Sequence, residues 1–79
     1  MLSELKTDNK TVGLKQSIKK IRSGEAKKVF IALDAAPTLI NEIKGALKET
    51  EIPTVEVSGM KELGRAAGID VGAAVVVVY

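Results

Sequence analysis

The sequence has 79 residues, which suits one domain, because single hydrophobic cores usually serve units of about 50 to 200 residues. It contains no cysteine and no histidine, so disulfide-stapled modules and cysteine enzymes are excluded, and zinc sites and histidine catalysis lose their usual residues. The net charge of +2 is unevenly spread: residues 10–28 carry +6, residues 1–9 carry −1, and the remainder carries −3. Such a local excess of positive charge is typical of a surface that binds a polyanion.

The first predicted helix follows a short strand at residues 10–12 and ends before Gly24, a residue that commonly terminates helices. One of its faces is apolar, with side chains that recur at i, i+4 and i+7: Leu14, Ile18 and Ile21. This spacing predicts a helix of about ten residues that packs against a sheet.

The remaining elements alternate strand, helix, strand, helix, strand. Continuous runs of β-branched and other apolar residues at 28–34 and 75–79 predict central strands that are covered on both faces, and residues 54–58 predict a weaker strand. Helical spacing of apolar residues predicts one helix after Pro37 and another from Met60 to Gly68. The alternation predicts an α/β sandwich whose parallel strand pairs are joined by right-handed crossovers.

The class of protein follows from what the sequence lacks. Its longest apolar stretch, residues 73–79, is far below the roughly 20 residues of a membrane span, and its start has no apolar segment of signal-peptide length. We therefore expect one soluble, cytoplasmic domain over residues 1–79, with no bound cofactor or metal.

A second face of the first helix is basic, because Lys15, Lys19 and Arg22 recur about 100° from the apolar face. No acidic residue within the helix neutralises them, so an external polyanion is the simplest partner, and a merely solvated face is the alternative. Gly13 would let a phosphate approach the unpaired N–H groups at the helix start. Gln16 offers a donor and an acceptor that can read a base edge.

The scarcity of aromatic residues indicates which nucleic acid to expect. The two aromatic residues are Phe30, in an apolar strand, and Tyr79, whereas proteins that bind single strands usually stack bases on several rings. A structured RNA fits better. Two other classes stay open: a protein-interaction module, and a nucleotide enzyme using Asp34, although no phosphate-loop motif occurs and Asp34 before Pro37 is typical of a helix cap.

Four motifs in a fixed order point to a family. They are G-L-K-Q-S-I-K-K at 13–20, V-F-I-A-L-D-A-A-P at 29–37, I-P-T-V-E-V at 52–57 and M-K-E-L-G-R-A-A-G at 60–68. Together they resemble the ribosomal protein L-seven-Ae and L-thirty-e superfamily, and most of all its small bacterial members. The resemblance implies a three-layer α-β-α sandwich with a small mixed, mostly four-stranded sheet. It also implies a non-enzymatic, monomeric protein that binds kink-turn RNA, an internal loop with tandem sheared G·A pairs, in a ribosomal, riboswitch or other ribonucleoprotein setting.

The resemblance also implies a site with two parts. The first helix would contact the G·A pairs and nearby phosphates, with a leucine where many family members have threonine. The resemblance assigns these contacts to Gly13, Lys15, Gln16 and Lys19, with Leu14 at the threonine position, and the basic charge of the same helix adds Lys20 and Arg22. A loop would cover an extruded nucleotide. Its expected residues are Val57, Ser58, Gly59 and Met60.

Overall fold

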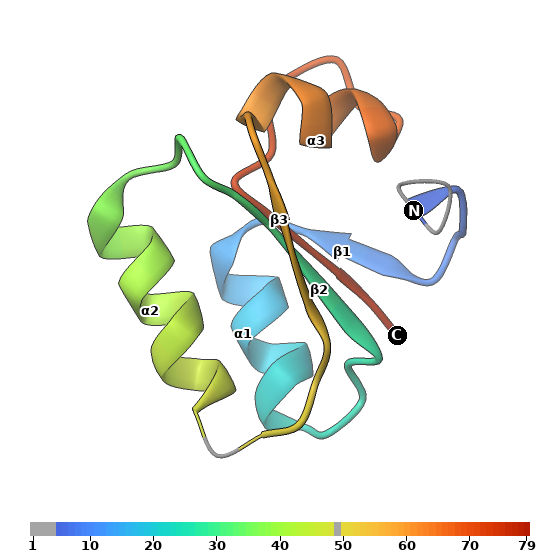
Figure 1. Ribbon diagram of the computed structural model, residues 1–79. Coiled ribbons are helices and arrows are strands. Elements are labelled where there is room, and N and C mark those ends of the chain that lie inside the picture. Colours follow the sequence, from blue (N-terminus) through green and yellow to red (C-terminus); the bar gives the residue numbers. More distant parts are fainter. Residues whose placement is uncertain (1–4, 49) are drawn as a thin grey trace.

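The computed structural model describes residues 5–48 and 50–79, in which three helices alternate with four strands (Figure 1). The strands are β1 (Lys10–Val12), β2 (Lys28–Ala32), β3 (Thr54–Val57) and β4 (Val75–Val78). The helices are α1 (Leu14–Arg22), α2 (Pro37–Leu47) and α3 (Met60–Ala66). The order and type of the predicted elements are confirmed, although β2 ends two residues earlier than the apolar run suggested.

The four strands form one mixed sheet in the order β1-β4-β2-β3. The apolar strands β2 and β4 are central, as predicted. Strands β2 and β3 pair in parallel, whereas β4 runs antiparallel to both of its neighbours. The mixed, four-stranded sheet that the resemblance implied is confirmed, whereas the parallel pairing predicted from the alternation of elements does not extend to β4. The segment after α3 folds back to the start of that helix, where the N–H of Ala73 donates to the carbonyl of Met60, so β4 begins at the end of the sheet where β3 finishes.

The sheet separates two cores, which makes the fold a three-layer sandwich. Alternate side chains of β2 point to opposite faces: Val29 and Ile31 pack beneath α1 and α2, whereas Phe30 and Ala32 pack beneath α3. Figure 1 shows α1 and α2 side by side on one face and α3 on the other. Burial on both faces explains why these strands are continuous apolar runs.

One edge of the sheet collects the starts of all three helices. Strands β1, β2 and β3 end there and β4 begins there, so α1, α2 and α3 each start at the same edge. We call it the upper edge, after its place in Figure 1, and define it by residues 12–14, 33–37, 57–60 and 71–75. Among the described residues, no helix is both long and apolar enough to cross a membrane.

Candidate nucleic-acid interface

The start of α1 has a backbone conformation that only glycine adopts without strain. Gly13 has φ 108° and ψ 159°, and its N–H donates to the carbonyl of Val75 at 3.2 Å. A Cβ added at Gly13 would meet no atom within 4 Å. Gly13 is therefore required by the backbone conformation, and it leaves open space in front of the helix.

The N–H groups at this helix start are not capped. No side chain accepts a hydrogen bond from them, and the first turn of α1 contains no acidic residue. Unpaired N–H groups and the positive end of the helix dipole attract anions. The start of α1 therefore has the electrostatics of an anion site.

The predicted basic face of α1 is present. Lys15, Gln16, Lys19 and Arg22 are exposed, and within residues 5–48 and 50–79 the three cations have no ion pair. A groove of about 230 Å³ runs along this side of the helix. It is lined by Gln16, Lys19, Lys20, Ser23 and Glu25. The neighbouring Leu14 is instead half-buried and packs against the core beneath α1 and α2.

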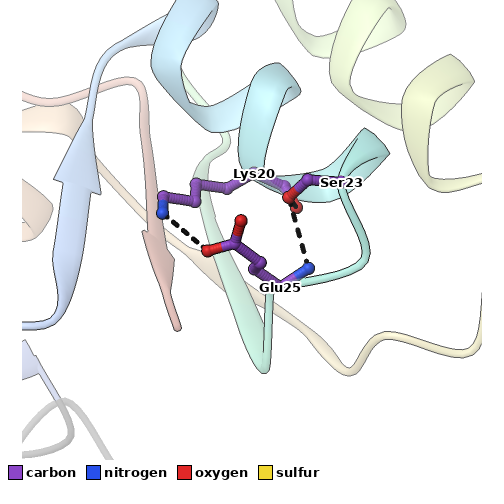
Figure 2. Close-up of polar contacts among 3 residues, drawn as sticks. All are labelled: Lys20, Ser23 and Glu25. Atoms are coloured by element: carbon purple, nitrogen blue, oxygen red, sulfur yellow. Dashed lines mark hydrogen bonds and ion pairs between the residues drawn. The ribbon is translucent and has the colours of Figure 1, made fainter.

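Lys20 differs from Lys15, Lys19 and Arg22 because its charge already has a partner (Figure 2). Its Nζ donates to Oε2 of Glu25 at 2.9 Å and lies 3.9 Å from the centre of the Tyr79 ring. The hydrogen bond to Glu25 raises the pKa of Lys20, and the same bond lowers the pKa of Glu25. Gly24, with φ 80°, turns the chain so that Glu25 returns toward the helix. The ammonium of Lys20 is therefore already paired, which makes it less available for the phosphate contact that was expected of it.

The second part of the expected site lies between β3 and α3. Val57 is 4% exposed and belongs to the core beneath α3, so its side chain cannot reach a ligand. Ser58 is exposed, but its hydroxyl donates to Oε2 of Glu62 at 2.7 Å. Gly59 is half-buried with extended backbone, and Met60 is half-buried against the core. These three residues, but not the side chain of Val57, remain available at the upper edge.

Asp34 caps a helix, but not the helix that was expected. Its Oδ1 accepts a hydrogen bond from the backbone N–H of Met60 at 2.8 Å, at the start of α3. The start of α2 has no side-chain cap, and Pro37 near its first position has no N–H, which leaves one fewer unpaired donor there. Asp34 therefore holds the β2–α2 loop against the β3–α3 loop.

Two exposed apolar residues at the upper edge escaped the sequence analysis. Leu33 is 51% exposed and Val71 is 70% exposed, and these are the large hydrophobic residues that the described part of the chain leaves exposed. Leu33 directly follows the last residue of β2, so it was assigned to the apolar strand. The sequence does carry a signal for both. Leu33 precedes Asp34, and Val71 lies between Asp70 and Gly72, and such neighbours are typical of exposed turns.

Residues 73–75 join the two parts of the site. Gly13 donates to the carbonyl of Val75, and Ala73 donates to the carbonyl of Met60 at 3.0 Å. The start of α1 and the start of α3 are therefore held on opposite sides of one short backbone segment. The upper edge presents uncapped N–H groups and exposed apolar side chains, and the basic face of α1 begins next to it with Lys15.

A family model supports this reading of the sequence and fold. The model of the ribosomal protein L7Ae/L30e/S12e/Gadd45 family matches residues 2–79. The chain belongs to this family. The resemblance inferred from the four motifs is thereby confirmed, together with the α/β class of the fold and the expectation of a non-enzymatic protein.

Named relatives and solved structures agree with the family. The chain is 39% identical over 74 residues to an RNA-binding protein of Geobacillus sp. (strain WCH70), a match that covers 94% of this chain and 90% of that protein. It is 40% identical over 67 residues to RNA-binding protein YbxF of Geobacillus stearothermophilus, covering 85% and 82%. The structure of a 15.5kD RNA binding protein of Giardia lamblia superposes with a TM-score of 0.86 at 25% identity, covering 98% and 67%.

Proposed function

We propose that this family member is a non-enzymatic RNA-binding protein that recognises kink-turn RNA with the upper edge and the basic face of α1. RNA binding is supported by the relatives, which are described as RNA-binding proteins. The observation that carries the proposal is the start of α1, where uncapped N–H groups, an unobstructed Gly13 and unpaired lysines share one surface.

The proposed contacts are of two kinds: cations that bind phosphates, and an amide that recognises a base. Lys15, Lys19 and Arg22 hold phosphates, since their charges have no partner among the described residues. Gln16 reads a guanine edge, because its exposed amide lies in the same groove as Lys19 and offers both a donor and an acceptor. Lys20 contributes mainly through its bond to Glu25, which shapes the far end of that groove.

The β3–α3 loop supplies the second half of the proposed interface. An unpaired base that is turned out of a bent RNA exposes an apolar face, and Met60 offers a half-buried apolar side chain beside Gly59. The bond from Met60 N–H to Asp34 fixes the backbone there before any RNA binds. A loop that is already fixed loses less conformational freedom on binding.

The proposed form of the protein is a cytoplasmic monomer that works within a ribonucleoprotein, on ribosomal RNA or a riboswitch. Obligate dimers bury large apolar interfaces. Within the described ranges, the exposed large hydrophobic residues are Leu33 and Val71, and both lie at the edge assigned to RNA. Light scattering with and without RNA would test the monomer.

The proposal is tested by titrating two RNAs of equal length and charge at two salt concentrations. One RNA contains a kink-turn, and in the other the two G·A pairs are replaced by Watson–Crick pairs. We expect much tighter binding to the kink-turn, with the difference preserved at the higher salt, because salt weakens the phosphate contacts that both RNAs share. Equal affinities would reduce the function to unspecific binding of polyanions.

A further inference from the structure

The outer side of α3 carries a groove that the sequence analysis did not identify. Its volume is about 510 Å³, within the ~300–1,000 Å³ typical of ligand sites. It is lined by Lys61, Arg65, Ile69, Asp70, Val71 and Gly72. Its lining residues come from α3 and from the loop that leads into β4, so it adjoins the upper edge on the face of the sheet opposite α1.

Two glycines hold this groove in shape. A Cβ added at Gly64 would overlap the carbonyl oxygen of Val71, and one added at Gly72 would lie 3.1 Å from Cβ of Met60. The loop at residues 69–72 therefore packs directly on the backbone of α3. Ala73, which follows it, donates to the carbonyl of Met60. The groove wall is thus tied to the β3–α3 loop of the proposed interface.

The charges in the groove are unpaired. Lys61 and Arg65 are one helical turn apart on α3, and neither side chain has an ion pair or hydrogen-bond partner in the part of the chain that the structure describes. Glu62, which lies between them, is bonded to Ser58 instead. Asp70 lines the same groove and is also unpaired. The groove therefore presents two cations, one carboxylate and an exposed apolar wall.

This combination fits a nucleotide better than a simple anion. Lys61 and Arg65 match a phosphate, Asp70 can accept hydrogen bonds from ribose hydroxyls or a base amino group, and Val71 offers an apolar surface to a base. A free inorganic anion would be repelled by Asp70 and would leave Val71 uncovered. The continuity with the upper edge favours a nucleotide that belongs to the same RNA.

We propose that the groove between α3 and residues 69–72 binds an unpaired stretch of RNA backbone that continues beyond the kink, with Lys61 and Arg65 on its phosphates. This inference rests on the proposed function. It extends the footprint from the groove of α1, across the upper edge, to the opposite side of the molecule. The RNA would then be held on both sides of the β3–α3 loop.

The test compares two double variants with equal loss of charge. Lys61→Ala with Arg65→Ala removes the groove cations. Lys44→Ala with Lys48→Ala removes an exposed pair at the same spacing from the far end of α2. Binding of a kink-turn RNA with single-stranded extensions is measured across salt concentrations. We expect the plot of log affinity against log salt to lose about 1.4 in slope for the groove variant, the value for two single-strand phosphates, and almost nothing for the control.

The outcomes separate the two proposals. If the wild-type protein does not prefer the kink-turn over its Watson–Crick copy, the proposed function is wrong and the groove assignment is overturned with it. If the wild type discriminates but the groove variant behaves like the α2 control, only the groove assignment is overturned. Equal folding of both variants is checked by thermal unfolding, and the double variant Lys61→Arg with Arg65→Lys should keep the full slope.

A second arm identifies the source of the nucleotide. Amide signals of residues 61–72 are followed by NMR while either the extended RNA or adenosine monophosphate is added. We expect the RNA to shift these signals at stoichiometric concentration and the mononucleotide to shift them only at far higher concentration. Shifts caused by the mononucleotide alone would overturn the assignment to RNA.

Discussion

The two ends of α1 are built in opposite ways. At its start, Gly13 leaves the first N–H groups uncapped, and no acidic residue lies in the first turn. At its end, the backbone N–H of Glu25 donates to the carbonyl of Lys20, and the hydroxyl of Ser23 donates to the same carbonyl at 2.9 Å. The Lys20 ammonium is in turn held by the Glu25 carboxylate.

The difference teaches how a small domain makes a binding surface without losing its fold. Hydrogen bonds from Ser23 and Glu25 stabilise the end of α1. The N–H groups at its start have no side-chain partner, so they can donate to a ligand. A glycine at the helix start costs roughly a few tenths of a kcal/mol of stability relative to a good side-chain cap. That cost is offset where the helix packs, through the apolar face of Leu14, Ile18 and Ile21.

The largest effect is expected from alanine at the two positive-φ glycines that flank α1. Gly13→Ala places a Cβ at φ 108°, and Gly24→Ala places one at φ 80°, so each should destabilise the fold by about 1–3 kcal/mol. Gly13→Ala should also weaken kink-turn binding about tenfold or more, equal to about 1.4 kcal/mol. Gly24→Ala is the matched control for stability; because it acts only on the far end of the groove, it should weaken binding much less than Gly13→Ala. Thermal unfolding and RNA titration measure both. Equal losses of affinity would show that only stability matters.

Gln16→Ala should reduce the preference for the kink-turn over its Watson–Crick copy. Losing one base-reading side chain typically costs about 1–3 kcal/mol of preference for the correct sequence. We expect the kink-turn to lose that amount while its Watson–Crick copy is bound as before. Asn41→Ala removes an exposed amide from α2 and serves as the control. A Gln16→Ala protein that weakens equally on both RNAs would contradict a role in base recognition.

Lys19 and Lys20 are neighbours whose removal should have different consequences. Lys19→Ala should lower the slope of log affinity against log salt by about one, because one phosphate contact is lost. Lys20→Ala should change the slope little, since its ammonium already pairs with Glu25, and should instead lower the stability of the end of α1. The same slope change in both variants would show that RNA displaces Glu25 from Lys20.

Much of the fold could be predicted from the sequence because its signals are local. The uninterrupted apolar runs of β2 and β4 identified the two central strands, and Gly24 and Gly68 marked the ends of α1 and α3. The direction of β4 could not be predicted in the same way. It depends on how the segment after α3 folds back to Met60, a tertiary contact that no residue pattern reveals.

The basic face of the site could be predicted from the spacing of charged residues, but the pairing of individual side chains could not. Regular spacing placed Lys15, Lys19 and Arg22 on one exposed face. The pairing of Lys20 with Glu25 depends on the turn at Gly24, and the bond from Asp34 to α3 joins residues 26 positions apart. Contacts of this kind are created by the tertiary fold, so residue spacing alone does not reveal them. The kink-turn itself remains a prediction from the resemblance.

Ser17, midway along α1, should separate stability from binding. It is fully buried, and its hydroxyl has no hydrogen-bond partner. Ser17→Ala removes an unsatisfied polar group and adds a better helix former, so stability should rise by about 1 kcal/mol with RNA affinity unchanged. Ser23→Ala is the control, because its hydroxyl bonds to the Lys20 carbonyl and its loss should be destabilising. A destabilised Ser17→Ala protein would show that the hydroxyl has a partner, such as a buried water.

The smallest effect concerns the closed end of α1 and its dependence on pH. The bond from Lys20 lowers the pKa of Glu25 below its ordinary 4.5, so the stability it contributes is present above pH 4.5 and is lost as the pH falls through the lowered pKa. The same bond raises the pKa of Lys20 above 10.5, so that contribution is present below pH 10.5 and is lost as the pH rises through the raised pKa. NMR titration of the Glu25 carboxyl should show its pKa rising in Lys20→Gln but not in Lys44→Gln. An unmoved pKa in Lys20→Gln would mean that the pair seen in Figure 2 does not persist in solution, and Lys20 would then be as free to bind phosphate as Lys19.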